Sequence, residues 1–372
     1  MMTRNIDKLT IVLPFFGDGG MERAMINLCE GFLARQISVD LVLLRKGYGT
    51  LASEIPSGVK VIEFGAKNYY QAFFKYYNYL KNSKADGIIS LATPTNLICI
   101  AGKLSSREKI KLLVSTQVTV TSDGPKGLIK RILRKFIYRL YNFADVAHAA
   151  SLGVAEDLVS FGVNKGKIKV IYNPVVSPKI LEMSQQEPPH EWFRQKEVPI
   201  VLGIGRLVAQ KDFFTLLRAF ALARKEKNMR LAILGEGPDR EALIRLSQEL
   251  GITSDFVLLG FSNNPYSYLK RASLFILSSA WEGFGNVLAE AIALGTPAVS
   301  TDCPHGPREI LENGKYGKLV GVGDFINLST AILETLVQPP SSDFLQKGAE
   351  RFTIEKVTEE YLNVFTEKIN GK

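Results

Sequence analysis

Short apolar runs recur along the chain, and most are followed by a glycine or charged loop and then by a helical segment. In the first half these runs begin at Leu9 and continue to 169–172; in the second half they begin at Val198 and continue to 298–300. Near-continuous apolar strands that alternate with helices are typical of parallel sheets covered on both faces. The sequence therefore predicts an α/β fold with two Rossmann-like, doubly wound domains and a cleft between them.

The length of the chain sets the number of domains. At 372 residues it is longer than one hydrophobic core usually supports. Prolines and polar residues gather at 178–197, which predicts a linker. We therefore expect an N-terminal domain at 1–177, a C-terminal domain at 198–353, and a final segment at 354–372 with a helix at 354–369.

Basic charge is concentrated in the N-terminal half. The whole chain has a formal net charge of +9, whereas residues 1–177 hold 24 Lys and Arg against 13 Asp and Glu, a net charge of +11. This asymmetry indicates an anionic partner, either nucleic acid or a membrane surface. Because the sequence has no helix-turn-helix, zinc-finger or RNA-binding signature, we expect no nucleic-acid partner.

Two segments supply much of this basic charge. Residues 69–80 place seven aromatic side chains in twelve positions beside lysines, and residues 126–141 predict a helix with a broad apolar face and a basic face. Such a helix can lie in the interface of an anionic membrane, but its apolar face also suits a protein core. We expect an exposed edge to contact the membrane and most of the apolar side chains to be buried: Leu128, Ile129, Ile132, Leu133, Phe136, Ile137 and Leu140.

The sequence also indicates a compartment. No apolar run approaches the roughly 18 residues of a membrane span, and the run at 9–16 is typical of a buried strand rather than a signal peptide. The three cysteines have neither a CxxC pair nor metal-ligand spacing, which favours a reducing environment. We expect a cytoplasmic protein that associates peripherally with the inner face of the cytoplasmic membrane.

The stretch at 281–297 combines a glycine turn with a helix. It follows a short apolar run, so Glu282 should lie at the carboxyl end of a strand, where α/β folds bind ligands. The helix N-terminus would favour an anion, and Glu290 could accept hydrogen bonds from hydroxyl groups. A phosphorylated sugar or nucleotide would satisfy both. Taken alone, the stretch is equally well explained as an amphipathic helix with a solvated Glu290.

Other strand ends in the second half also carry glycine or charge. Arg206 and Lys211 follow Gly205 and are five positions apart across a turn, so they could converge on one anion. Taken alone, the turn with Arg206 and Lys211 is better explained as a surface turn. The motif GEGP is better explained by turn geometry, and the loop at 301–309 is equally well explained as a rigid turn. The later candidates of this kind are Gly237, His305 and Arg308.

Six motifs occur in order along nearly the whole chain: GGMERA, YNPV, GRLVAQKD, GEGP, EGFGNVLAEA and GPREIL. Their order and spacing resemble glycosyltransferase family 4, whose members are retaining nucleotide-sugar transferases of GT-B fold. The resemblance implies that the N-terminal domain binds the acceptor and the C-terminal domain the nucleotide sugar, across a central cleft. It also implies that the last helix returns to the N-terminal domain.

The resemblance assigns roles to individual residues. Glu282 and Glu290 match the family's E-x7-E signature, which implies that Glu282 lies near the donor sugar and that Glu290 binds the ribose. Arg206 and Lys211 would hold the diphosphate, and with Glu282 they are the expected catalytic residues. The other donor-binding residues that it implies are Gly19, Gly20, Gly205, Gly237, Gly283, Phe284, Gly285 and Asn286.

The family's mechanism is front-face transfer with retention, in which the leaving diphosphate helps to deprotonate the acceptor hydroxyl. Many relatives carry a histidine in an N-domain loop where this sequence has Gln117, which can hydrogen-bond a donor or acceptor sugar but cannot act as an acid or base. His305 and Arg308 are further possible contacts with donor or acceptor. No DxD motif occurs, so we expect no metal and no other cofactor.

These features together predict a retaining, metal-independent glycosyltransferase that moves a hexose or N-acetylhexosamine from a UDP-sugar to a lipid-linked saccharide. The setting would be bacterial surface polysaccharide biosynthesis, of the O-antigen or capsule type. A GT-B-like nucleotide-sugar epimerase or phosphorylase is the enzymatic alternative. A dehydrogenase is disfavoured because the glycines at 203 and 205 lack a third at Val208. The non-enzymatic alternative is a module that binds anionic membranes.

Overall fold

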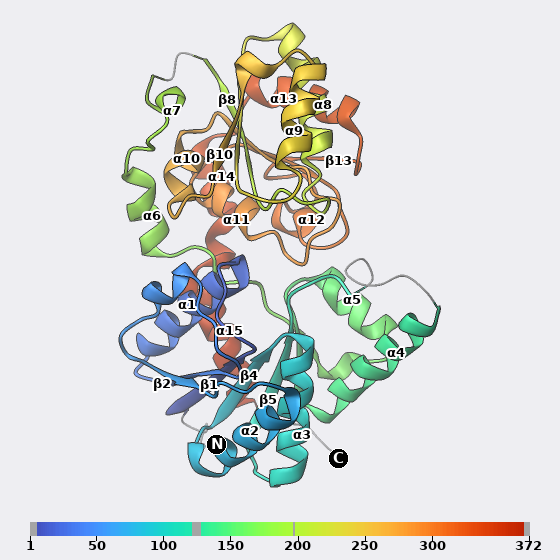
Figure 1. Ribbon diagram of the computed structural model, residues 1–372. Coiled ribbons are helices and arrows are strands. Elements are labelled where there is room, and N and C mark those ends of the chain that lie inside the picture. Colours follow the sequence, from blue (N-terminus) through green and yellow to red (C-terminus); the bar gives the residue numbers. More distant parts are fainter. Residues whose placement is uncertain (1–5, 121–127, 196–197, 368–372) are drawn as a thin grey trace. The chain divides into compact units, whose positions relative to one another are not determined.

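The computed structural model describes residues 6–120, 128–195 and 198–367 (Figure 1). The chain divides into two compact units, of which the first comprises residues 1–175 and 353–372 and the second residues 176–352. Each unit contains one parallel sheet with helices between its strands. The predicted α/β architecture with two doubly wound domains is therefore confirmed.

The sheet of the first unit has seven parallel strands in the order β3-β2-β1-β4-β5-β6-β7. Strand order reverses between β1 and β4, and in doubly wound sheets ligands bind at the carboxyl ends beside such a reversal. The strands are β1 (Lys8–Leu13), β2 (Ser38–Leu43), β3 (Val59–Glu63), β4 (Gly87–Leu91), β5 (Lys111–Thr116), β6 (Val146–Ala149) and β7 (Ile168–Val170).

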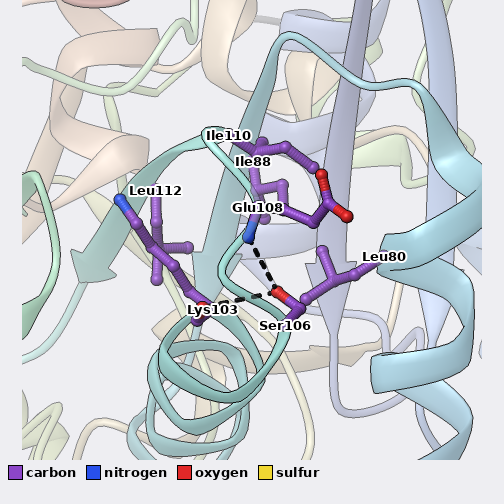
Figure 2. Close-up of a pocket in the computed structure, with 7 residues that line it drawn as sticks. All are labelled: Leu80, Ile88, Lys103, Ser106, Glu108, Ile110 and Leu112. Atoms are coloured by element: carbon purple, nitrogen blue, oxygen red, sulfur yellow. Dashed lines mark hydrogen bonds between the residues drawn. The ribbon is translucent and has the colours of Figure 1, made fainter.

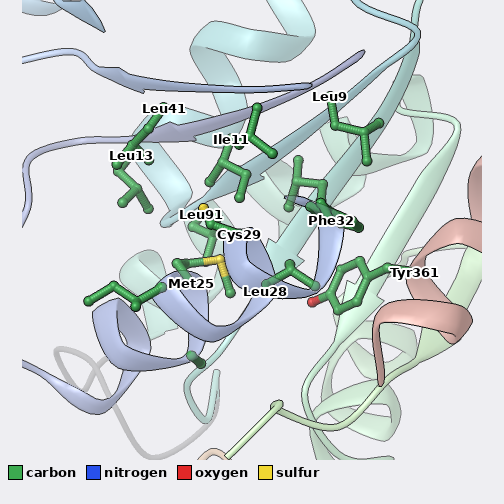
Figure 3. Packing of buried hydrophobic residues seen from close by; sticks show 14 of the residues in the cluster. Leu9, Ile11, Leu13, Met25, Leu28, Cys29, Phe32, Leu41, Leu91 and Tyr361 are labelled. Carbon is green, nitrogen blue, oxygen red and sulfur yellow. The ribbon is translucent and has the colours of Figure 1, made fainter. Parts of the chain in front are cut away.

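Helices of the first unit include the last helix of the chain. Leu28 and Phe32 pack against Ile11 of β1, and Tyr361 of the last helix joins the same core (Figure 3). The helices are α1 (Gly20–Leu33), η1 (Thr50–Glu54), α2 (Tyr69–Ser83), α3 (Thr93–Ser106), α4 (Leu128–Arg139), η2 (Leu140–Phe143), α5 (Leu152–Ser160), η3 (Lys165–Lys167) and α15 (Ile354–Thr366).

The sheet of the second unit has six parallel strands in the order β10-β9-β8-β11-β12-β13. They are β8 (Ile200–Ile204), β9 (Arg230–Leu234), β10 (Phe256–Gly260), β11 (Leu274–Leu277), β12 (Ala298–Thr301) and β13 (Lys318–Val320). The helices are α6 (Pro178–Gln185), α7 (Glu191–Gln195), α8 (Phe213–Glu226), α9 (Arg240–Glu249), η4 (Thr253–Asp255), α10 (Pro265–Arg271), α11 (Asn286–Ala293), α12 (Pro307–Ile310), α13 (Phe325–Val337), α14 (Ser342–Ala349) and η5 (Glu350–Phe352).

Residues 178–197 were expected to form a linker, but they carry the helices α6 and α7. Pro178 starts α6 instead of breaking it, because proline fits the first turn of a helix and Ser177 accepts a hydrogen bond from the Ile180 amide at 3.3 Å. The segment is bonded into the second unit, since the Asn264 side chain donates to the Met183 carbonyl at 2.9 Å.

The apolar face of α4 was expected to be mostly buried, and that prediction is wrong. Ile129, Ile132, Leu133 and Phe136 are 57% to 82% exposed. The helix packs through its opposite side, where Tyr138 is buried and Arg134 donates to the Val120 carbonyl at 2.7 Å. Amphipathic periodicity predicts two unlike faces but does not decide which one meets the protein. Residues 126 and 127, where the predicted helix began, lie outside the described residues.

Among the described residues, no helix is both long enough and apolar enough to span a bilayer.

Gly31 sets the distance between α1 and α15. A Cβ atom at Gly31 would lie 1.9 Å from Oγ1 of Thr358. We expect Gly31→Ala to lower the free energy of unfolding by about 1–3 kcal/mol, because overpacking outweighs the roughly 1 kcal/mol that alanine gains in a helix. Urea unfolding measures this change.

Gly166→Ala is the matched control, because its nearest contact would be an ordinary 3.4 Å from Asn164 Oδ1. Adding Thr358→Ala to Gly31→Ala should recover part of the lost stability. If Gly31→Ala is as stable as the control, α15 is not packed as closely as described.

Candidate functional site

Loops at the carboxyl ends of β8 and β11 are tied together in the second unit. The Gln210 side chain donates to the Trp281 carbonyl at 3.0 Å, and the Ala280 amide donates to the Gln210 carbonyl at 2.8 Å. Ser278 Oγ donates to the Lys211 carbonyl at 2.7 Å. The predicted anion-binding turn and the start of the 281–297 stretch therefore form one assembly.

Lys211 and Glu282 form an ion pair within this assembly. The Lys211 ammonium contacts Glu282 Oε1, and Ser279 Oγ donates to the same oxygen at 2.7 Å. Both charged side chains are largely buried, with 16% and 9% exposed. Arg206, by contrast, is exposed and donates to Gln210 Oε1 at 3.4 Å. An incoming anion would thus meet Arg206 directly but would share Lys211 with a carboxylate.

The helix α11 begins at a glycine that needs a left-handed backbone, since Gly285 has φ +101°. Glu290 lies about one turn after Asn286, the first residue of this helix, and is only 6% exposed. The alternative of a solvated Glu290 is therefore wrong, because the side chain has almost no contact with solvent. A buried carboxylate needs polar partners to offset the free energy of its burial. The Phe284 side chain packs on Phe352 with ring centroids 5.3 Å apart, so only its backbone can meet a ligand.

Two glycines let the turns after β8 and β9 approach each other closely. A Cβ atom at Gly235 would lie 1.9 Å from the Gly205 carbonyl oxygen, and one at Gly237 would lie 2.3 Å from the Leu207 carbonyl oxygen. Both glycines of the GEGP motif are thus required by the close packing of these two turns, independently of any contact with a ligand. It brings Gly205 and Gly237 into the same group of loops.

The loop after β12 is linked to the same assembly, since Thr301 Oγ1 donates to the Ser279 carbonyl at 2.6 Å. Arg308 forms a two-point ion pair with Asp302, in which Nε donates to Oδ1 at 3.0 Å.

Cys303 in the same loop is not a nucleophile at neutral pH, because burial and the nearby Glu282 charge raise the pKa of its thiol to about 12. His305 lies in this loop with φ +71°.

In the first unit, the glycine loop before α1 is bonded to a carboxylate of its own. Glu22 is 6% exposed and accepts hydrogen bonds from the amides of Gly17 at 3.3 Å and Gly19 at 3.1 Å. Asp18 accepts from the Leu51 amide at 3.0 Å. Gly19 is the N-cap residue of α1 and Gly20 is its first residue, and the Gly19 amide already donates to Glu22. A glutamate three positions after a glycine N-cap was the signal that could have revealed this.

Gln117 lies directly after β5, at the carboxyl edge of the first sheet. Its Nε2 donates to Ser115 Oγ at 3.2 Å. The sequence analysis missed Ser115 and left His148 without a role, although Ser115 Oγ lies 2.8 Å from His148 Nδ1. Neighbouring parallel strands β5 and β6 pair Ser115 with His148 directly, and only knowledge of that register could have joined them.

A small hollow lies at the other edge of the first sheet (Figure 2). Ile88 and Leu112 near the starts of β4 and β5, and Ser106 at the end of α3, contribute to its wall. Ser106 Oγ donates to the Lys103 carbonyl at 3.3 Å and accepts from the Glu108 amide at 3.4 Å. The hollow is therefore far along the strands from Gln117 and contains none of the predicted site residues.

Family models match both units of the chain. The model described as Glycosyltransferase Family 4 matches residues 18–177, and the model described as Glycosyl transferases group 1 matches residues 184–352. Together they span the glycine loop, Gln117 and all the candidate residues of the second unit.

Two similar proteins match along almost their full length. One is the N-acetylgalactosamine-N,N'-diacetylbacillosaminyl-diphospho-undecaprenol 4-alpha-N-acetylgalactosaminyltransferase of Campylobacter jejuni, 28% identical over 96% of this chain and 99% of that protein. Another is the lipopolysaccharide core biosynthesis glycosyltransferase LpsE of Rhizobium meliloti, 27% identical over 95% of this chain and 98% of that protein.

Solved structures share the fold at lower identity. The apo form of the lipopolysaccharide outer core galactosyltransferase WaaB covers 96% of this chain and 98% of its own, with a TM-score of 0.75 and 22% identity. Anabaena HepE in complex with UDP covers 96% and 99%, with a TM-score of 0.76 and 18% identity. The family models, the relatives and the fold agree, and this chain belongs to the GT-B glycosyltransferases of family 4.

Proposed function

We propose that this glycosyltransferase moves a hexose or N-acetylhexosamine from a UDP-sugar to a lipid-linked saccharide, with retention and without a metal. The setting is bacterial surface polysaccharide biosynthesis at the inner face of the cytoplasmic membrane. The names of the relatives support this proposal, since one acts on a diphospho-undecaprenol saccharide and another belongs to lipopolysaccharide core biosynthesis. A fold relative is a complex with UDP.

The observation that carries the proposal is the ion pair between Lys211 and Glu282 beside the exposed Arg206. A nucleoside diphosphate gains negative charge as its bond to the sugar breaks, so cations held there stabilise the transition state more than the ground state. Lys211 is positioned by Glu282 before the donor arrives, and the planar Arg206 guanidinium suits two phosphate oxygens. When the diphosphate binds Lys211, the Glu282 carboxylate would be able to contact the donor sugar.

The remaining steps need no protein base. In front-face transfer the acceptor hydroxyl oxygen bonds to the anomeric carbon, and an oxygen of the leaving diphosphate takes the hydroxyl proton. The bond between the anomeric carbon and the diphosphate breaks on the same face, which preserves the anomeric configuration. Among the second unit's candidate residues, Glu290 is buried on α11 and suits the ribose hydroxyl groups.

Lys211→Ala should lower kcat/KM for the donor by at least about a hundredfold, the loss typical of removing one charge-stabilising donor from an active site. UDP release, followed with purified protein and candidate UDP-sugars, measures it. Lys225→Ala, an exposed lysine at the end of α8, should behave as wild type.

Removing Lys211 leaves Glu282 buried without its cation, which could itself unfold the loop. The double variant Lys211→Ala/Glu282→Gln removes that charge and should remain folded but inactive. Unchanged UDP affinity and turnover in Lys211→Ala would refute the role of this lysine.

Glu290→Gln should weaken UDP binding by about tenfold or more while leaving the melting temperature nearly unchanged, because hydrogen bonds to a charged acceptor are the stronger ones. Isothermal titration calorimetry with UDP gives the affinity. Glu249→Gln, on the exposed side of α9, is the control. Equal UDP affinity in both variants would contradict the assignment to ribose.

The exposed face of α4 supports membrane association. Ile129, Ile132, Leu133 and Phe136 point away from the side through which the helix packs. Their row is flanked by exposed cations, and the helix contains no acidic residue: the exposed cations are Arg131, Lys135 and Arg139. An apolar row beside a basic row matches the acyl boundary and headgroups of an anionic bilayer.

The double variant Ile132→Ser/Phe136→Ser should lower partitioning onto phosphatidylglycerol vesicles by about tenfold or more, because it removes buried apolar area from the contact. Vesicle flotation measures partitioning. Ile326→Ser/Val337→Ser changes two exposed apolar residues of α13 and should leave partitioning unchanged.

Both pairs should keep wild-type transfer to a short-chain, water-soluble acceptor analogue, so that loss of membrane binding is separated from loss of chemistry. If the wild-type protein does not bind anionic vesicles, the proposed membrane association is refuted, whereas the proposed transfer reaction is not affected.

A further inference from the structure

A buried hydrogen-bond network joins three elements of the first unit behind Gln117. His148 on β6 has no exposed surface, and its Nε2 lies 2.8 Å from the Ile171 carbonyl oxygen. A carbonyl oxygen only accepts, so Nε2 carries the hydrogen. Burial lowers the pKa of His148 to about 4, so the ring is neutral near pH 7 and its Nδ1 holds a lone pair.

The tautomer of His148 fixes the direction of every other bond in the network. Ser115 Oγ lies 2.8 Å from Nδ1, and because Nδ1 can only accept, the serine must donate its one hydroxyl hydrogen there. The serine oxygen is then left only with lone pairs. Gln117 lies 3.2 Å away and must present its NH2 group to that oxygen. The amide orientation follows from the network.

The other end of the Gln117 amide is a buried acceptor. Gln117 Oε1 has no hydrogen-bond partner among the described residues, and an unmet buried acceptor costs free energy that a suitable donor would recover. Gln117 stands directly after β5, at the sheet edge where doubly wound domains bind ligands. A ligand hydroxyl that reaches Oε1 would complete the set of bonds.

The last helix of the chain reaches the same network. The Tyr361 hydroxyl on α15 lies 3.3 Å from His148 Nε2, and its ring centroid lies 5.3 Å from that of His148. Tyr361 is fully buried. Tyr361 therefore packs against the ring of His148, whereas the orientation of the Gln117 amide depends on residues from β5 and β6.

We propose that Ser115 and His148 are positioning residues that hold the Gln117 amide with its oxygen turned to accept a hydrogen bond from a hydroxyl group of the saccharide substrate. This inference rests on the proposed transfer reaction. It makes Gln117 a contact that selects a hydroxyl at one position of the sugar, and Ser115 the residue that prevents the amide from flipping.

Steady-state kinetics with the donor and acceptor on which the wild type is active test this proposal. Gln117→Ala should raise KM for one of the two substrates about tenfold with a smaller change in kcat, and Ser115→Ala should raise the same KM about three- to tenfold. The control is Thr10→Val, which removes another buried hydroxyl of the same sheet, one that lies 2.8 Å from the Tyr79 hydroxyl.

The substrate whose KM changes should also discriminate less against its deoxy analogue in both variants. The positioning role of Ser115 is wrong if Ser115→Ala is folded and matches the control Thr10→Val both in its KM values and in its discrimination against the deoxy analogue. Wild-type protein that transfers no sugar would refute the proposed function. The hydrogen-bond network would then be tested by spectroscopy alone.

The network itself is tested without activity. Nitrogen-15 spectra of histidine-labelled protein contain three histidines, and a His148→Gln variant identifies one of them. We expect the His148 ring to be neutral with the hydrogen on Nε2 from pH 5.5 to 8, and Ser115→Ala to shift its Nδ1 resonance. A hydrogen on Nδ1 would reverse the bond directions and overturn the proposal.

Discussion

The pairing of Lys211 with Glu282 joins parts of the second unit that are 71 positions apart in the chain. A carboxylate that is largely buried must be met by a cation or by hydrogen-bond donors, and Glu282 has both in Lys211 and Ser279. This requirement draws the turn after β8 onto the loop after β11. The cation is consequently held in place by the protein rather than by a ligand, which reduces the reorganisation that binding would need.

In the first unit a carboxylate of the protein, rather than a cation, occupies the corresponding kind of loop. There a carboxylate, Glu22, fills a glycine loop whose amides would otherwise attract an anion. A phosphate brought to this loop would have to displace Glu22 or bind outside it. The loop is thus shaped by its own carboxylate, which favours a neutral hydroxyl-bearing partner over a phosphate at this position. This preference is compatible with the proposal that the diphosphate binds in the second unit.

Sequence periodicity predicted the elements that are regular and strongly apolar. β1 and α11 were recognised because buried strands and amphipathic helices have distinct patterns. β13 has three residues, and β3 exposes Lys60, Val61 and Glu63, so neither forms a buried apolar run. Contacts between distant positions could not be predicted from periodicity, and the ion pair of Lys211 with Glu282, 71 positions away, is one of them. The exposed face of α4 was missed because periodicity does not identify a neighbour.

Part of the basic charge of the N-terminal half is exposed on α4. Three of its described carboxylates are buried, those of Glu22, Asp40 and Asp157, and Asp157 accepts from the Val120 amide at 2.9 Å. The cations of α4 have no acidic neighbour on their own helix. The exposed cations of α4 therefore face solvent, and an anionic surface would be attracted to them from about a Debye length away. The exposed apolar row of α4 would act only after that approach, because the hydrophobic contribution requires contact.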